Sequence, residues 1–238
     1  MEFLEVKGVV KRFGGLAAVN NVDMHVSEGE IVGLIGPNGA GKTTLFGCIA
    51  GYHNVSAGEI YFNGHRIDGM LPNKICELGV ARTFQIMKSI TKMTVLENIM
   101  VGAFMVSKRV PLARKKAIEV MDFCGLSHLS GTKAAVLTVG GKKRLEVARA
   151  LATNPKLILL DEVMAGLTSK ESQDAVQLIY KIRDMGVTVL MVEHVMEIIM
   201  PISDRMVVLD SGEKIAQGTP EEIARDEKVI EAYLGVVP

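Results

Sequence analysis

The sequence predicts an α/β fold with a mainly parallel sheet, an N-terminal antiparallel β part and an inserted α-helical subdomain. Apolar, β-branched runs such as "KLILLDE", "VTVLMVE" and "RMVVLDSG" return at intervals that leave room for crossover helices, which is typical of a parallel sheet. Between about residues 86 and 154 the apolar residues instead follow a helical period. With 238 residues, of which 48% are apolar, the chain is large enough for one such domain with a substantial core.

The first third of the chain predicts the antiparallel part and one buried strand. "FLEVKGVVKRF" alternates apolar and polar residues, as a strand does, and a second strand is expected over residues 19–26. "GEIVGLIG" is a short β-branched run that ends in Gly, which predicts a buried strand before a helix over about residues 43–49. "AGEIYFNGHRI" predicts a hairpin, because Asn63 and Gly64 together favour a two-residue turn.

The next elements are helical until the apolar strands return. Thr94 is followed three residues later by Glu97, which predicts a capping box at the start of "TVLENIMVGAFM". "PLARKKAIEVMDFCGL" begins with Pro and has Gly125 near its end, the usual limits of an amphipathic helix. A further helix is expected over about residues 170–185, and a helical tail over residues 221–234.

Charge and composition exclude several classes of protein. Lys plus Arg and Asp plus Glu number 27 each, so the formal net charge is zero, which argues against a general nucleic-acid binder. No apolar run approaches the roughly 18 residues of a membrane span, and we expect no signal peptide. Cys48, Cys76 and Cys124 lack metal-ligand spacing and are expected to be buried in a reducing compartment.

One motif points directly to phosphate. "GPNGAGKT", residues 36–43, fits the pattern G-x-x-x-x-G-K-[ST] and lies between a predicted strand and a predicted helix. The glycines let backbone N–H groups face phosphate oxygens, and the helix N-terminus adds the positive end of its dipole. Lys42 is expected to reach the β- and γ-phosphates, and Thr43 to place a hydroxyl on Mg²⁺. The chain is therefore predicted to bind a nucleoside triphosphate.

Two carboxylates follow the buried run "LILLDE". At the carboxyl edge of a parallel sheet, Asp161 can hold Mg²⁺ directly or through water. Glu162 beside it can polarise a water for attack on the γ-phosphate. Acidic residues are common in turns, but combined with the phosphate loop this pair predicts triphosphate hydrolysis.

The order of the motifs resembles that of the nucleotide-binding subunits of ATP-binding cassette (ABC) transporters. After the phosphate loop come Gln85, a helical insertion, "LTVGGKKRL", "LILLDE", "AGLT" and His194. "RFGGLAAVNNV", "GVARTFQ", "MTVLENI" and "GTPEEIARDEKVIEAYLG" look more closely like the ATPases of branched-chain amino-acid importers. The resemblance implies a P-loop NTPase core of the ABC ATPase type in two parts, residues 1–85 and 155–218. Residues 86–154 would be the helical subdomain with the family's signature, and residues 219–238 a C-terminal helical tail.

The resemblance also implies roles for single residues. Phe13 would stack on adenine with Val19 beside the base, although an aromatic side chain is otherwise more often a core former. Gln85 would ligate Mg²⁺ or the attacking water, and His194 would contact the γ-phosphate and steady Glu162. The implied catalytic residues are Glu162, His194, Gln85 and Lys42, and the implied metal ligands are Thr43, Gln85 and Asp161. The implied nucleotide-binding residues are Phe13, Val19, Gly36, Asn38, Gly39, Ala40, Gly41, Lys42, Thr43, Thr44, Thr138, Gly140 and Gly141.

"LTVGGKKRL", residues 137–145, occupies the position of the family's signature but departs from its usual form. Thr138 stands for Ser, Val139 for Gly, and Gly141 for Gln. The resemblance implies that the hydroxyl of Thr138 and the backbone at Gly140 grip a γ-phosphate bound to a second copy. The basic residues 142–144 crowd a helix N-terminus, where each cation is unfavourable by roughly 0.3–1 kcal/mol, so we expect an anion nearby. We interpret the segment as a degenerate but working signature; a solvated basic face is the alternative.

Two other departures lie in the same half of the chain. Val163 stands where the family usually has Pro, and Thr168 where it usually has Asp or Asn, in the loop expected to couple two ATP sites. The apolar start of the helical block, "IMKSITKMTVLENIMVGAFM", exceeds what one buried helix face needs. We therefore expect a docking surface there, with its exposed positions among Met87, Ile90 and Met93; the alternative is that most of these residues form the core of the helical subdomain.

The implied cofactors are ATP and Mg²⁺. The implied partners are transmembrane permease subunits, a second copy or homologous ATPase subunit in an ATP-dependent head-to-tail dimer, and, indirectly, a periplasmic binding protein, with no nucleic acid. The chain would lie at the cytoplasmic face of the inner membrane as a peripheral subunit. Alternatives are the ATPase of a lipopolysaccharide-type exporter, a soluble ABC ATPase and, more remotely, a P-loop kinase. The transported substrate stays open at this stage: branched-chain amino acids follow from the resemblance alone, and urea, amides or aromatic acids are alternatives.

Overall fold

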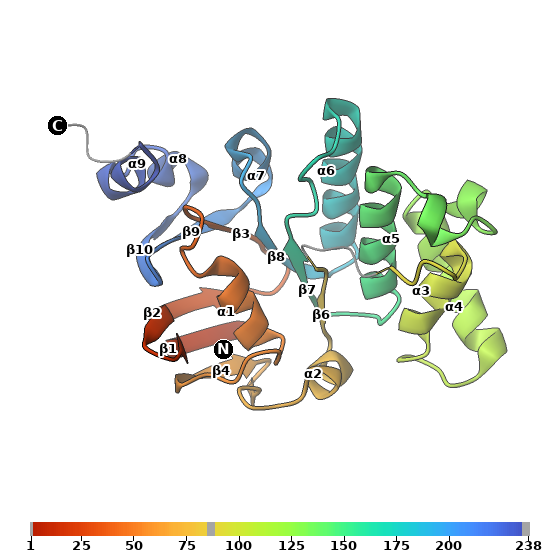
Figure 1. The fold of residues 1–238 in the computed structure, drawn as a ribbon, viewed down its shortest axis with the longest axis horizontal. Coiled ribbons are helices and arrows are strands. Elements are labelled where there is room, and N and C mark those ends of the chain that lie inside the picture. Colours follow the sequence, from red (N-terminus) through yellow and green to blue (C-terminus); the bar gives the residue numbers. More distant parts are fainter. Residues whose placement is uncertain (1, 85–88, 235–238) are drawn as a thin grey trace.

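The computed structural model describes residues 2–84 and 89–234 and has the predicted α/β architecture (Figure 1). A six-stranded sheet has the order β10-β9-β3-β8-β7-β6, and a separate four-stranded sheet has the order β2-β1-β4-β5. The larger sheet contains β3 (Ile31–Ile35), β6 (Val80–Arg82), β7 (Leu157–Asp161), β8 (Thr188–Val192), β9 (Arg205–Asp210) and β10 (Glu213–Gly218). The smaller sheet contains β1 (Leu4–Phe13), β2 (Leu16–Val26), β4 (Ala57–Phe62) and β5 (His65–Arg66).

The larger sheet is parallel except at one edge, where β10 runs antiparallel to β9. The smaller sheet is antiparallel throughout. In a parallel sheet the carboxyl ends of neighbouring strands meet at one edge, where ligands bind. The residues that follow β3, β7 and β8 are therefore brought together there, and these are the phosphate loop, Glu162 and residues 193–194.

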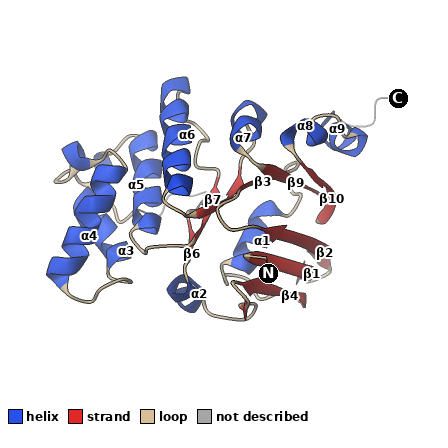
Figure 2. Ribbon diagram, turned by 180° about the vertical axis from the view of Figure 1, so that it is seen from behind, coloured by secondary structure: helices blue, strands red, loops and turns tan. Residues whose placement is uncertain are grey.

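Helices cover the larger sheet and form a block at one end of the molecule (Figures 1 and 2). The block contains α3 (Val95–Ala103), α4 (Val110–Phe123) and α5 (Val139–Leu151), with short 3₁₀ turns η1 (Ser127–Leu129) and η2 (Ala134–Val136) between the last two. The other helices are α1 (Lys42–Ile49), α2 (Pro72–Leu78), α6 (Ser169–Asp184), α7 (Met196–Ile202), α8 (Pro220–Ile223) and α9 (Glu227–Leu234). The last two lie at the end of the molecule opposite α4.

The core lies on both faces of the larger sheet, because successive side chains of a strand point to opposite faces. In β7, Ile158 and Leu160 join one cluster of buried side chains, which includes residues of α3 to α6. Leu157 and Leu159 join the second cluster, together with residues of α1 and the smaller sheet. Strands β3, β7 and β8 are buried along their whole length, as the continuous apolar runs predict.

Several local predictions are confirmed. Asn63 and Gly64 both have positive φ, 47° and 77°, as a two-residue hairpin turn of this kind requires. The side chains and backbones of Thr94 and Glu97 form both bonds of the capping box at the start of α3. The helix expected over residues 170–185 is α6. Within residues 2–84 and 89–234, no helix is both long and apolar enough to cross a membrane.

Some elements were not predicted. Strand β6 is only three residues long, and β10 is a half-exposed edge strand without apolar alternation. The prediction of a single helical tail is wrong, because the helix is interrupted between α8 and α9. Asp226 accepts hydrogen bonds from the N–H groups of Lys228 and Val229 there and so starts a new helix. Cys76 is only half-buried, whereas Cys48 and Cys124 are buried as expected.

Candidate nucleotide-binding site

The phosphate loop connects β3 to α1. Gly36 and Gly41 have positive φ, 146° and 98°, and a Cβ at either position would collide with a backbone carbonyl oxygen, of Leu209 and Ala18 respectively. Glycine is therefore required at both positions. No side chain caps the N-terminus of α1, so this end of the helix is available to an anion.

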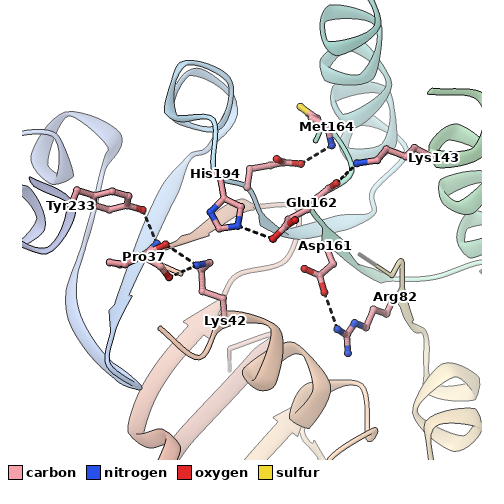
Figure 3. A network of polar contacts seen from close by, with 11 residues as sticks. Pro37, Lys42, Arg82, Lys143, Asp161, Glu162, Met164, His194 and Tyr233 are labelled. Carbon is pink, nitrogen blue, oxygen red and sulfur yellow. Dashed lines mark hydrogen bonds and ion pairs between the residues drawn. The ribbon is translucent and has the colours of Figure 1, made fainter. Parts of the chain in front are cut away.

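Lys42 folds back onto the loop that precedes it. Its Nζ donates hydrogen bonds to the carbonyl oxygens of Gly36 at 2.7 Å and Pro37 at 2.8 Å (Figure 3). Only 5% of Lys42 is exposed, and this burial lowers the pKa of its amino group, while Glu162 and Asp161 oppose the shift. The Lys42 ammonium is thus held at the floor of the site, within the loop that the motif assigns to phosphate.

One pocket of about 220 Å³ collects most of the residues expected to bind phosphate. It is lined by Ala18, Asn38, Gly39, Ala40, Gly41, Lys42, Thr43, Thr44, Glu162 and His194. Residues from the two halves of the chain, separated by the helical block, therefore meet at one cavity, as the parallel topology requires.

Glu162 and His194 form a pair at this pocket. His194 Nε2 lies 2.7 Å from Glu162 Oε1 (Figure 3). Glu162 has a left-handed backbone with φ of 51°, which is uncommon outside glycine and costs about 1–3 kcal/mol. Its N–H donates to Val192 O at 2.9 Å, and its carbonyl accepts from Lys143 Nζ at 2.5 Å. Contacts from β8 and α5 therefore hold the carboxylate in the position that faces His194.

Asp161 is arranged differently from its neighbour. Its Oδ2 accepts a hydrogen bond from Arg82 Nη2 at 2.8 Å, and its N–H donates to Thr83 Oγ1 at 3.0 Å. Burial raises the pKa of the Asp161 carboxyl, and Arg82 opposes that shift. Its Oδ1 is buried with no hydrogen-bond partner among the described residues. A buried acceptor left in this way is destabilising, so the geometry fits a cation bound at Oδ1.

Mg²⁺ fits this donor set better than a metal held by protein alone. Residues 2–84 and 89–234 contain no group of three or more His, Cys, Asp or Glu side chains that could hold a metal. Mg²⁺ is usually held by one or two protein groups together with substrate phosphates and waters. Asp161 Oδ1 and the hydroxyl of Thr43 in the phosphate pocket are such groups. Gln85, the third expected ligand, lies outside the described residues.

Glu193 is a buried carboxyl that the sequence did not single out. It accepts a hydrogen bond from the N–H of Met164 at 2.8 Å, and its residue is 1% exposed. Burial raises the pKa of Glu193 to about 7, although its hydrogen bond with Met164 and the charge of Lys143 oppose the shift. It therefore ties the segment after Glu162 to β8. The position directly before His194 was the only signal that could have revealed it.

The expected signature segment lies outside the phosphate pocket of its own chain. Thr138 caps α5 by accepting the N–H of Gly141 at 3.1 Å. Gly140 lies so close to Glu171 that a Cβ there would crowd that carboxylate. Its N–H has no hydrogen-bond acceptor within the described parts of the chain, and Val139 is 48% exposed. The start of α5 thus presents an N–H group and a hydroxyl to its surroundings.

The anion expected beside the basic residues 142–144 is partly supplied by the chain itself, which corrects the sequence interpretation. The carboxylates of Glu193 and Glu162 act on the charge of Lys143, and Arg144 lies 3.8 Å from Asp174. All three basic residues are half-buried, so the alternative of a fully solvated basic face does not hold either. The charge pattern therefore carries less information about an external phosphate than we expected.

Three other positions differ from expectation or explain a departure. Val19 is fully buried in the core, because the alternation of β2 turns it inward, and Ala18 lines the phosphate pocket instead. Phe13 is 47% exposed, with its ring edge-on to His53 at 5.4 Å, so it is not a core aromatic. Thr168 caps α6 and forms a capping box with Glu171. Asp and Asn also cap helix N-termini, which explains how Thr can replace them here.

Comparison with known proteins agrees with this geometry. The chain matches the family described as "ABC transporter" over residues 19–165, and residues 213–237 match the family "Branched-chain amino acid ATP-binding cassette transporter". It is 41% identical to the high-affinity branched-chain amino acid transport ATP-binding protein BraF of Pseudomonas aeruginosa, over 98% of this chain and 97% of BraF. Identity to LivG of Escherichia coli K12, which has the same description, is 40% with the same coverage.

Solved structures show the same fold. A nucleotide-free ATP-binding cassette from an ABC transporter has a TM-score of 0.91 at 33% identity, covering 99% of this chain and 100% of the other. A dimeric cassette in a post-hydrolysis state with ADP and Pi has a TM-score of 0.83 at 27% identity, covering 91% and 98%. With its phosphate loop, paired carboxylates and family-specific C-terminal segment, the chain belongs to the ATP-binding subunits of ABC transporters.

Proposed function

We propose that this chain is the ATP-binding and ATP-hydrolysing subunit of an ABC importer, and that it couples ATP-driven dimerisation to uptake of branched-chain or related amino acids. The observation that carries the proposal is the pocket that unites the phosphate loop with the Glu162–His194 pair. The near full-length similarity to BraF and LivG supports the importer assignment and the substrate class. BraF and LivG are both described as branched-chain amino acid transport ATP-binding proteins, which favours this assignment over an exporter ATPase, a soluble ABC ATPase or a kinase.

The residues of the pocket account for hydrolysis. Lys42 and the N–H groups at the start of α1 bind the triphosphate. Thr43, Gln85 and Asp161 would hold Mg²⁺, which would supply positive charge to offset that of the phosphates. Glu162 takes a proton from water as the water oxygen bonds to the γ-phosphorus. The bond from the γ-phosphorus to the bridging oxygen breaks, and ADP and phosphate leave. His194 orients the Glu162 carboxylate and contacts the γ-phosphate.

The second half of each site would come from another copy. The Thr138 hydroxyl and the N–H of Gly140, which has no acceptor among the described residues, lie with the small Gly141 at a partly exposed helix start, outside their own chain's pocket. A head-to-tail pair would place this helix start against the γ-phosphate of the partner. The dimeric cassette with ADP and Pi supports such an assembly. A homologous ATPase subunit could take the place of the second copy.

A groove between the core and the helical block is the proposed docking site for a permease segment. It has a volume of about 290 Å³ and is lined by residues of both parts, among them Tyr52, Phe84, Val101 and Met105. Tyr52, Val101 and Met105 are exposed large apolar residues, as are Ile90 and Met93 on the same block. Met87 lies outside the described residues. The chain would thus be a peripheral subunit at the cytoplasmic membrane face, reached by a periplasmic binding protein only through the permease.

Uptake by the assembled transporter tests this function. The subunit is co-expressed with candidate permease and binding proteins, purified and reconstituted in vesicles, and ATP-driven accumulation of radiolabelled leucine, isoleucine and valine is measured. We expect accumulation that requires ATP and is lost in the Glu162→Gln variant. Assembly and ATP hydrolysis without uptake of any branched-chain, amide or aromatic substrate would refute the importer assignment while leaving the ATPase intact.

A further inference from the structure

We infer that Arg82 links the proposed docking groove to the Mg²⁺-binding carboxylate of Asp161. On one side, Arg82 Nη2 donates to Asp161 Oδ2 at 2.8 Å, and the two side chains are only 9% and 0% exposed (Figure 3). On the other side, Arg82 lines the groove. One side chain therefore touches both the metal site and the surface at which a permease segment would bind. The importance of the groove rests on the proposed function; the contact itself does not.

Aromatic rings hold the guanidinium between these two places. Arg82 Cζ lies 5.7 Å from the centroid of the Tyr52 ring and 5.6 Å from that of Phe84, and Phe46 packs behind it at 5.9 Å. The rings of Tyr52 and Phe84 meet edge-to-face at 5.4 Å. Both rings also line the groove, and Tyr52 is 49% exposed. A segment that enters the groove must contact these rings, and their position sets the position of the guanidinium.

The ion pair between Arg82 and Asp161 rests on one hydrogen bond, so the guanidinium can move relative to the carboxylate. Of the five N–H donors of the guanidinium, a single one bonds to Asp161, instead of the two parallel bonds that an arginine and a carboxylate can form. Arg82 Nε and Asp161 Oδ1 are both buried without hydrogen-bond partners among the described residues. The positive guanidinium of Arg82 beside Oδ2 competes with a cation at Oδ1, because both draw on the negative charge of the same Asp161 carboxylate. Moving the guanidinium therefore changes how strongly Asp161 holds Mg²⁺.

A double-mutant cycle on the isolated subunit tests the link. For each variant, the Mg²⁺ concentration that produces half of the Mg²⁺-dependent change in ATP affinity is measured by equilibrium binding, without turnover. Tyr52→Ala is expected to change this concentration in the wild-type background but not in the Arg82→Met background. The non-additivity should be about threefold to thirtyfold, which corresponds to a cation–π contact shielded from water. Arg82→Lys keeps the charge but not the planar group, so Tyr52→Ala should show only part of this non-additivity with it.

The groove supplies its own control. Val101→Ala alters another exposed groove residue, which has no hydrogen bond or ring contact with Arg82 among the described residues, so it should combine additively with Arg82→Met. Thermal unfolding confirms that every variant compared is folded. Additive effects of Tyr52→Ala and Arg82→Met in folded proteins would overturn the link, whatever the groove binds. Non-additivity with normal permease assembly in groove variants would instead keep the link and refute the docking site.

Discussion

The phosphate loop and the start of α5 are both glycine-containing segments that lead into helices, but they are supported in different ways. The loop is held by its own chain: Leu209 packs against Gly36, Lys42 bonds back to it, and Gly36 N–H donates to Tyr233 Oη of α9 at 2.7 Å (Figure 3). The start of α5 has an internal cap from Thr138 and otherwise faces outward. The phosphate loop is therefore supported within one chain, whereas in the proposed dimer the start of α5 would meet the nucleotide of a partner.

This difference explains why the two motifs differ in how closely they follow their patterns. Backbone geometry at Gly36 and Gly41 leaves no room for any side chain, so the phosphate loop keeps its glycines. At the start of α5, Val139 is half-exposed, and a Cβ at Gly141 would meet Leu137 and Thr138 only at ordinary contact distance. Side chains at residues 139 and 141 therefore meet no clash within the chain, whereas a Cβ at Gly140 would crowd Glu171.

The largest expected effect is on the rate of ATP hydrolysis, when Glu162, the proposed general base beside the phosphate loop, is replaced. Glu162→Gln should lower kcat by about 10²–10⁴-fold, because general base catalysis contributes that much, while ATP binding is retained. Phosphate release measures the rate, and size-exclusion light scattering should show an ATP-dependent dimer that persists. A variant that still hydrolyses ATP at the wild-type rate would remove Glu162 from the mechanism.

The next effect is on ATP-dependent dimerisation and tests the start of α5 separately from the phosphate loop. Adding Val139→Asp or Gly140→Asp to Glu162→Gln should abolish the ATP-dependent dimer, because a carboxylate against phosphate in an interface costs about 2–5 kcal/mol. Val139 is the cleaner position, since Asp at 140 would also meet Glu171 within its own chain. ATP binding should be unchanged. Met185→Asp, at another exposed apolar residue, is the matched control and should leave the dimer intact.

If both acidic variants still dimerise with ATP, the start of α5 is not the trans half of the site. Residues 137–145 would then be an ordinary helix start whose charges are met by Glu162, Glu193 and Asp174 of the same chain.

A smaller effect on ATP affinity is expected from Phe13, the side chain proposed to stack on the adenine base. Phe13→Ala should weaken ATP binding by about 1–2 kcal/mol if the exposed ring stacks on adenine. Leu16→Ala, opposite Phe13 in the β1–β2 pair, provides the comparison for a simple loss of apolar surface. Isothermal titration of ATP and GTP measures both variants. Equal affinities for wild type and Phe13→Ala would place the base elsewhere.

The smallest effect concerns the support of the phosphate loop by α9. Tyr233→Phe keeps the ring but removes the acceptor for Gly36 N–H, which should weaken ATP binding by about 0.5–1.5 kcal/mol. Tyr61→Phe removes a hydroxyl that bonds only to Glu59 among the described residues, far from the loop, and should have no effect on ATP. If the two variants bind ATP equally well, the hydroxyl of Tyr233 does not support the site.

The fold and the centre of the site could be predicted because their signals are local. Apolar runs identified β3, β7, β8 and β9, and the spacing within residues 36–43 identified the loop, since a few adjacent residues determine each feature. Contacts between distant parts had no such signal. Arg82 with Asp161 and Gly36 with Tyr233 depend on which strands become neighbours. Val19 was misplaced for the same reason, because the inward face of β2 depends on what packs beneath it.

The contact between Gly36 and Tyr233 joins an early and a late part of the chain, so it can form only near the end of synthesis. The two residues are 197 positions apart, so at about 5–20 residues per second the hydroxyl is made roughly 10–40 s after the N–H that it accepts. Leu209, whose carbonyl packs against Gly36, is likewise made late. For that interval the nascent chain carries the phosphate-loop motif without its neighbours. A ribosome-bound chain should therefore bind ATP more weakly until its last strands and α9 have been released.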